Sequence, residues 1–229
     1  MDYLQDLTVC NLYSSTTAAE AMRQLFDVEP ERSKIGNAEP RSAVWPKYPA
    51  PVVRLDLDGQ RELTEMNWGF LTRNISGKTG KELKPKAYNN ARGETVAVKG
   101  LWKESFIHRR CLIPASSFRE AKGRNPATDV WFALKGSEPR PPFAMAGLWR
   151  PMSAELSLLD STGLTHTVVT TTANDIVRQV HPTRMVVILD PADYETWLTG
   201  SPEDAMGLVR PYPAEEMQIV REGIGILKD

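Results

Sequence analysis

The chain has 229 residues, of which 41% are hydrophobic and 25% are charged, and its formal net charge at pH 7 is −1. This length and composition suit one sizeable globular domain, and the small charge excludes a global attraction to a polyanion, so any nucleic-acid site has to be a local patch. Two cysteines make no disulfide framework, no apolar run reaches a membrane span, and the acidic first six residues are no signal peptide. We therefore expect a cytoplasmic protein without membrane contact.

The first third of the chain predicts one helix and one hairpin. Apolar residues at helical spacing predict a helix over 17–26, and the polar, proline-containing segment 29–43 predicts a loop. Alternating residues over 51–57 and 62–70, joined by an Asp-Gly turn, predict a β-hairpin. The lysine-rich segment 72–87 predicts an exposed loop.

The rest of the chain predicts short strands and two short helices. A helix is expected from Asp190-Pro191 to Leu198 with Gly200 as its stop, and another near Pro202. Further strands are expected at 110–113, 130–134, 143–149, 165–171 and 185–189. Because strands and helices do not alternate regularly, a parallel sheet is not expected. The sequence predicts a single α+β domain with a mainly antiparallel, barrel-like β core and a few flanking helices.

Cys10 and His181 are candidates for chemistry, each with an ordinary alternative. An unpaired cysteine is usually a small buried hydrophobe. His181 precedes a Pro-Thr-Arg turn that leads into an apolar strand, a position from which its ring can be held rigidly toward a cleft. The alternative is a turn histidine that bonds the backbone.

Glu120, Asn90 and Arg92 are further candidates. Glu120 follows an apolar strand, where burial would raise the carboxyl pKa and suit an acid or base; the alternative is an exposed glutamate. Asn90 offers an amide that orients a substrate and Arg92 a guanidinium that binds phosphate, or both satisfy loop backbone groups. Three histidines and two cysteines without ligand spacing predict no metal, and we expect no cofactor.

The order of several short motifs is more specific than any one of them. The motifs are Cys-Asn-Leu-Tyr-Ser at 10–14, Trp-Gly-Phe at 68–70, Asn-Ala-Arg-x-Glu-Thr at 90–95, Arg-Cys-Leu-Ile-Pro-Ala-x-x-Phe-x-Glu at 110–120, Phe-Ala-x-Ala-Gly-Leu-Trp at 143–149, a Thr-Thr-Ala strand end, and His-Pro-x-x-Met-x-Val-Ile-Leu at 181–189. Together they resemble the SRAP family, the SOS response-associated peptidases or abasic-site processing proteins.

The resemblance implies covalent chemistry at an N-terminal cysteine. The amine and thiol of Cys10 would condense with the aldehyde of an abasic site in single-stranded DNA, closing a thiazolidine ring. Glu120 would transfer protons, His181 would assist sugar-ring opening and reversal, and Asn90 would hold the cysteine. Autoproteolysis and lyase-type cleavage are side activities that the same residues would support.

The resemblance also implies a DNA-binding surface. Arg92 and Arg184 would contact phosphates, Trp68 would stack on a base, and Thr170 would lie near the site. The partner would be abasic single-stranded DNA in the bacterial cytoplasm, at the nucleoid, and the protein would act as a monomer.

One departure from the family pattern concerns the first nine residues. In the family the cysteine follows the initiator methionine, whereas here residues 1–9 precede Cys10 and convert its nitrogen to an amide. Autoproteolysis would remove this extension, or translation would begin at Val9, which we favour because GTG is an alternative start codon. We therefore expect a domain over 10–225 whose active form begins at Cys10.

Two other classes of function fit some of the same residues. A cysteine peptidase or amidohydrolase would use Cys10 and His181 as nucleophile and base, with Asn90 as orienter. A noncovalent single-strand binder would use Trp68 and the basic segment 72–87.

Overall fold

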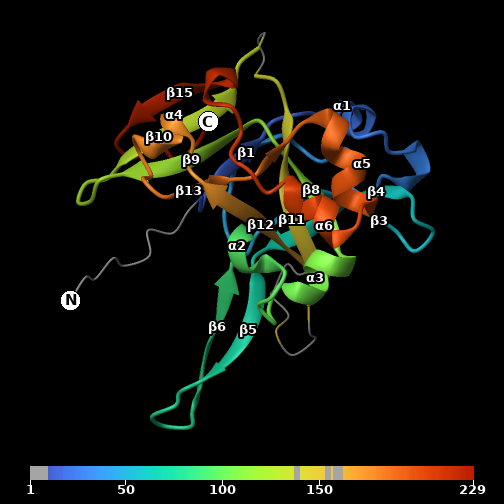
Figure 1. Cartoon of the computed structure of the whole chain (residues 1–229), viewed down its shortest axis with the longest axis horizontal. Coiled ribbons are helices and arrows are strands. Elements are labelled where there is room, and N and C mark those ends of the chain that lie inside the picture. The colour runs from blue at the N-terminus through green and yellow to red at the C-terminus, as the bar shows by residue number, and fades with distance from the viewer. Residues whose placement is uncertain (1–9, 137–139, 153–155, 157–161) are drawn as a thin grey trace.

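Strands dominate the chain and form a large sheet, a smaller sheet and a separate two-stranded hairpin (Figure 1). The computed structural model describes residues 10–136, 140–152, 156 and 162–229. Helices are short and lie mainly against the large sheet.

Five strands of the large sheet close into a ring, because β3, β8, β11, β12 and β4 pair in this order and β4 pairs again with β3. All of these pairings are antiparallel except β12–β4. Short strands β13 and β14 extend the sheet, and β7 pairs in parallel with β12. The strands are β3 (Pro49–Leu55), β4 (Arg61–Trp68), β7 (Asn90–Arg92), β8 (Arg110–Ala115), β11 (Phe143–Pro151), β12 (Leu164–Thr172), β13 (Arg184–Val186) and β14 (Ile188–Leu189). The predicted α+β fold with a mainly antiparallel core is confirmed.

The smaller sheet has the strand order β15-β10-β9-β1-β2, and all its pairings are antiparallel. Its strands are β1 (Tyr13–Ser15), β2 (Arg41–Val44), β9 (Ser117–Lys122), β10 (Thr128–Leu134) and β15 (Met217–Gly223). The chain passes from the large sheet to the small one between β8 and β9, with a single residue, Ser116, between them.

Both faces of the large sheet are buried, and alternate residues of one strand enter different apolar clusters. In β3, Val52 belongs to the cluster shared with the small sheet, whereas Val53 belongs to the cluster under the helices. Val168 and Val169 of β12 divide in the same way. Burial on both faces explains why adjacent valines occur in each of these strands, where a sheet with one solvated face would alternate apolar and polar residues.

The helices cover the second cluster with apolar side chains such as Phe106 and Trp197. They are α1 (Ala19–Leu25), α2 (Gly93–Val96), α3 (Lys103–His108), α5 (Tyr194–Thr199) and α6 (Pro202–Gly207), while α4 (Asp175–Arg178) packs on the first cluster. Single 3₁₀ turns lie at Pro30–Arg32 (η1), Pro191–Asp193 (η3) and Ala214–Glu216 (η4). In the described part of the chain, every helix is too short or too polar to cross a membrane.

The predicted elements are largely present, with defined differences. The helix over 17–26 corresponds to α1, and the helix before Gly200 divides into η3 and α5. The predicted loop 29–43 is wrong in part, because it contains η1 and the start of β2. The expected strand 185–189 is split, because β13 pairs with β12 while β14 pairs with β11.

The predicted loop at 72–87 is wrong, since this segment lies within the antiparallel pair β5 (Phe70–Ile75) and β6 (Glu82–Tyr88). Gly69 separates β4 from β5 with a φ of +116°, a conformation that favours glycine. Strands β9 and β15 were not predicted as strands, because polar residues interrupt their alternation.

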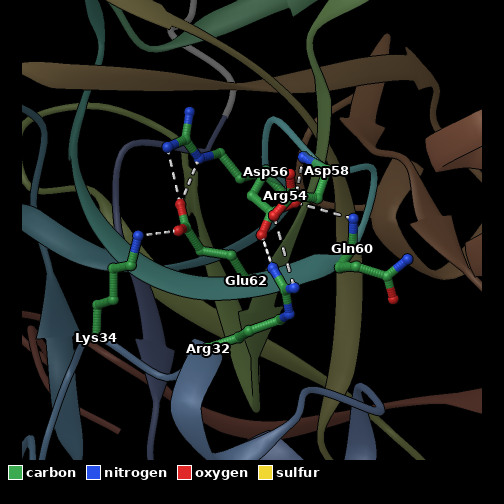
Figure 2. Close-up of polar contacts among 7 residues, drawn as sticks. All are labelled: Arg32, Lys34, Arg54, Asp56, Asp58, Gln60 and Glu62. Atoms are coloured by element: carbon green, nitrogen blue, oxygen red, sulfur yellow. Dashed lines mark hydrogen bonds and ion pairs between the residues drawn. The ribbon is translucent and has the colours of Figure 1, made fainter.

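A buried carboxylate ties the β3–β4 hairpin to the segment after η1 (Figure 2). The Glu62 side chain is 3% exposed; Lys34 donates to Oε2, and Arg54 Nε donates to Oε1 at 2.8 Å. Burial raises the pKa of Glu62, but the hydrogen bonds from Lys34 and Arg54 outweigh it and hold the pKa below its ordinary value.

The neighbouring turn is fixed by a second carboxylate. Asp56 Oδ1 accepts the backbone N–H groups of Asp58 and Gln60 at 2.9 and 3.0 Å, and its Oδ2 pairs with Arg32 (Figure 2). Gly59 supplies the positive φ, +75°, that closes this turn. The Asp-Gly signal therefore marks the hairpin correctly, although the loop is longer than two residues.

We expect Glu62→Gln to lower the free energy of unfolding by about 2 kcal/mol at neutral pH, because hydrogen bonds to a charged partner are lost. The folded-state pKa of Glu62 is depressed, so its contribution exists above the unfolded pKa of about 4.3 and is lost as pH falls through the folded pKa. Urea unfolding at several pH values measures the difference, which should shrink at acid pH. Exposed Glu222→Gln is the control, and an equal loss in both variants contradicts the assignment.

Candidate functional site

Cys10 lies just before β1 and is completely buried. Its φ is +30°, unusual for a residue with a side chain, and its Sγ donates to the carbonyl of Leu12 at 3.6 Å. The Leu12 carbonyl also accepts the backbone N–H of Arg119, which places this segment beside β9. Burial raises the pKa of the Cys10 thiol well above its ordinary value, and Glu120 adds to the effect.

Glu120 points into the apolar space between the two sheets. It lies two residues after Phe118 in β9, and alternate residues of a strand share a face, so it enters the same cluster as that phenylalanine. Its Oε1 accepts the backbone N–H of Cys10 at 3.0 Å. Burial raises the pKa of Glu120 to about 8, although this hydrogen bond and the charge of Arg119 act in the opposite direction.

Two asparagines hold the carbonyl oxygen of the same residue. The Nδ2 atoms of Asn89 and Asn90 donate to the carbonyl oxygen of Cys10 at 3.2 and 3.1 Å. Asn90 opens β7, whose parallel pairing with β12 fixes its position opposite Val168. The structure therefore brings together three of the predicted site residues: Cys10, Asn90 and Glu120.

Trp68 supports this arrangement from within the core. Its Nε1 donates to the carbonyl of Asn89 at 2.9 Å, and its ring lies between Tyr13, at 4.9 Å, and His166, at 6.5 Å between centroids. The side chain is fully buried, so neither ring face is open to a base. The prediction that Trp68 stacks on DNA is wrong for this conformation, and the residue orients Asn89 instead.

His181 approaches the first apolar cluster from the turn after α4. It is 3% exposed, and its Nδ1 accepts the backbone N–H of Arg184 at 3.2 Å, so the neutral ring carries its proton on Nε2. Val180 and Met185, on either side of it in sequence, belong to the cluster that contains Cys10. The backbone-bonding interpretation of this histidine is therefore correct, and its role toward a cleft stays a prediction.

Arg184 and Arg92 differ in their surroundings. The guanidinium of Arg184 pairs with both carboxylate oxygens of Glu94, and its Nε donates to Thr170 Oγ1 at 3.2 Å. Thr170 is 1% exposed, donates to the carbonyl of Ala91 and positions Arg184; its expected part in DNA binding stays a prediction. Arg92 is exposed on β7, opposite Thr170 in the pairing with β12.

Two residues at the site were not predicted from the sequence. Asn89 is one of them, and its only signal was its place in an Asn-Asn pair. Arg119 is the other: it donates to Asp129 at 2.6 Å and to Asn11 at 2.9 Å, and its charge lowers the pKa of Glu120. In the sequence, only its position next to Glu120 could have indicated Arg119 as a site residue.

The fold and the site define a mixed α/β protein that buries a cysteine near its N-terminal side, between one carboxyl group and two carboxamides. Within the described residues, His, Cys, Asp and Glu side chains form no group of three suited to a metal. Residues 9–222 match the family described as SOS response associated peptidase (SRAP), and the chain belongs to this family. The predicted family is confirmed.

Named relatives and solved structures agree with this membership. "Abasic site processing protein YoaM" of Bacillus subtilis is 28% identical over 214 residues, which cover 92% of this chain and 89% of YoaM. "Abasic site processing protein YoqW" of the same species is 32% identical over 132 residues, 56% of this chain, and the match spans only 57% of YoqW.

Among solved structures, a protein of Bordetella bronchiseptica is 26% identical, with a TM-score of 0.71 over 94% of this chain and 99% of that chain. A protein of Bacteroides thetaiotaomicron, 22% identical, shares the fold with a TM-score of 0.71 over 93% of this chain and 92% of that chain.

The raised pKa of Glu120 predicts a stability that falls as pH rises. Stability from the neutral carboxyl is complete below the unfolded pKa of about 4.3 and is lost as pH rises through the folded pKa of about 8. Within this window the linkage amounts to about 1.4 kcal/mol per pH unit. We expect urea unfolding of Glu120→Gln to lack this slope and that of exposed Glu222→Gln to retain it. A wild-type slope unchanged in Glu120→Gln contradicts the assignment.

Proposed function

We propose that this protein processes abasic sites in single-stranded DNA, forming a covalent thiazolidine through the amine and thiol of Cys10. Membership of the SRAP family supports the proposal, as do the names of YoaM and YoqW. The observation that carries it is the 3.0 Å hydrogen bond between the nitrogen of Cys10 and buried Glu120. A carboxyl group at hydrogen-bond distance from this nitrogen can give a proton to it or take one from it, which suits a reaction of the nitrogen itself.

The reaction requires a free amine, because an amide nitrogen does not condense with an aldehyde. The active form is therefore one that begins at Cys10, produced by initiation at Val9 or by removal of residues 1–9. Its α-amine occupies the place of the amide nitrogen beside Glu120.

Matched pKa values make proton exchange between these two groups nearly balanced. An α-amine has a pKa of about 8, and that of Glu120 is also about 8. Glu120 takes the proton of the ammonium group, and the neutral amine attacks the aldehyde carbon to form a carbinolamine. Glu120 then returns the proton to the carbinolamine hydroxyl, which leaves as water and yields the protonated imine.

The thiol completes the ring. Sγ of Cys10 adds to the carbon of the protonated imine, and the thiol proton passes to the Glu120 carboxylate, so no oxidant or reductant is required. Asn89 and Asn90 hold the Cys10 carbonyl at 3.2 and 3.1 Å, which fixes the amine and thiol relative to Glu120. His181 assists opening of the sugar ring and reversal.

Phosphate binding is assigned to Arg92 and Arg184. Arg92 is exposed and accessible to a DNA backbone. Arg184 pairs with Glu94, so a phosphate has to share or displace that carboxylate. The protein acts as a monomer on cytoplasmic DNA.

A conventional thiol hydrolase is less compatible with the site. Such enzymes depend on a lowered thiol pKa, whereas burial and Glu120 raise the pKa of Cys10. An amine nucleophile avoids this difficulty, because the thiol reacts only after the imine has formed.

The direct experiment mixes the protein beginning at Cys10 with a single-stranded oligonucleotide that carries one abasic site. We expect a shifted band on a denaturing gel without borohydride. A matched form with one glycine before Cys10 keeps the thiol but blocks the amine, and should give none. Cys10→Ser keeps the amine and should give a band only after borohydride reduction. If the protein beginning at Cys10 gives no shifted band, the proposal is refuted. If the form with the added glycine gives a band as strong as that protein does, the role of the amine is refuted.

We expect Glu120→Gln, in the form beginning at Cys10, to slow crosslinking by about 100-fold or more, because a general acid–base group is lost. The wild-type rate should rise as the amine loses its proton and fall above about pH 8 as Glu120 ionises. Single-turnover rates measured at pH values below and above about 8 test both the rise and the fall of the rate. Glu222→Gln should retain the wild-type profile, and an unchanged rate in Glu120→Gln excludes its proton-transfer role.

A further inference from the structure

The hairpin formed by β5 and β6, residues 70–88, is a projecting arm (Figure 1). Among the strands of the described ranges, β5 and β6 pair only with each other, from Phe70 opposite Tyr88 to Ile75 opposite Glu82. In Figure 1 the arm extends away from both sheets, and its residues from 77 to 86 are all exposed. The main core does not require so long an extension.

The root of the arm is fixed next to the candidate site. Phe70 is fully buried with its ring 5.3 Å from that of Trp102, and Tyr88 packs against the same tryptophan at 6.2 Å. Arg150 covers Phe70 at 4.6 Å and donates to the carbonyl of Leu71. The arm therefore runs directly into Asn89 and Asn90, which bind Cys10.

The arm is strongly basic in a chain that is otherwise acidic. It carries one acidic and five basic residues and thus a net charge of +4, whereas the whole chain carries −1 and the remainder −5. Arg73 pairs with Glu82 at 2.9 Å, which neutralises the one carboxylate. Among the residues that the structure describes, the other four basic side chains form no ion pair: Lys78, Lys81, Lys84 and Lys86.

The shape and composition of the arm favour duplex DNA over a single strand. Sites for single strands combine positive charge with aromatic rings that stack on bases. The two aromatic residues of the arm, Phe70 and Tyr88, pack against Trp102 at its root, and residues 71–87 contain none. A two-stranded β-ribbon fits the major groove of B-DNA, which is about 12 Å wide. Lys84 and Lys86 share one face of β6 by the alternation of the strand, which places two charges in a row.

We propose that the β5–β6 arm binds the phosphate backbone of duplex DNA that flanks the single-stranded abasic stretch. This inference rests on the proposed function. A strand of seven residues extends about 23 Å, and duplex DNA carries one negative charge per about 1.7 Å of its axis, so the arm spans about a dozen phosphates. It holds the duplex while Cys10 reaches the adjoining single strand.

The test measures the salt dependence of noncovalent binding with undamaged DNA. One probe is a single-stranded oligonucleotide, and the other is the same strand with a paired duplex at one end. Each phosphate contact on B-DNA contributes about 0.9 to the slope of log K against log salt. Lys84→Gln/Lys86→Gln should therefore reduce the slope by about 1.8 on the duplex probe and leave that on the single strand unchanged. Exposed Lys122→Gln/Lys228→Gln is the control and should match wild type on both probes.

Two results overturn the inference: an equal slope change on both probes, which assigns the arm to single strands, and an unchanged slope on the duplex probe. An unchanged urea midpoint establishes that the arm variant is folded. Crosslinking of a single-stranded abasic oligonucleotide by the arm variant beginning at Cys10 should equal that of wild type. Absence of crosslinking in both proteins refutes the proposed function, and the salt slopes still report on the arm.

Discussion

The hydrogen bond from the Cys10 nitrogen to Glu120 is the interaction on which the site depends. A carboxyl group inside an apolar cluster must be neutral or well bonded, because burying an unpaired charge is costly. Glu120 meets this condition through its raised pKa and its contact with Cys10. The two asparagines complete the arrangement by satisfying the Cys10 carbonyl. The backbone nitrogen and the carbonyl oxygen of Cys10 are thereby both held, and the positive φ of Cys10 is maintained by its surroundings.

The two sheets meet at this residue and make its position a property of the whole fold. Glu120 comes from the small sheet, whereas Asn90 comes from a strand that pairs with the large one. Trp68, at the end of β4, bonds Asn89 and packs against Tyr13 of β1. A shift between the sheets therefore moves the carboxyl group relative to the amides, which links core packing directly to the site's geometry.

Local patterns predicted the parts of the structure that depend on neighbours in sequence. The Asp-Gly turn and the apolar strands were recognised because alternation and turn chemistry are local. The β5–β6 arm was missed because its residues are exposed and need no apolar face. Its sequence therefore lacks the alternation of apolar and polar residues that indicates a strand and resembles that of a loop. Burial of Trp68 and Thr170 was missed for a different reason. It results from pairing between strands that are distant in the sequence, and local sequence patterns do not indicate such pairing. Motif order identified Cys10, Asn90 and Glu120, but their hydrogen bonds required the tertiary structure.

The β5–β6 arm has a consequence for how the family diversifies. Because its strands share no ladder with either main sheet, insertions or charge changes at its tip leave the register of every core strand intact. Selection can lengthen, shorten or recharge this element while the residues around Cys10 stay constant. The protein thus separates a fixed cysteine site from an adjustable appendage, and related proteins are free to differ in the appendage while they keep that site.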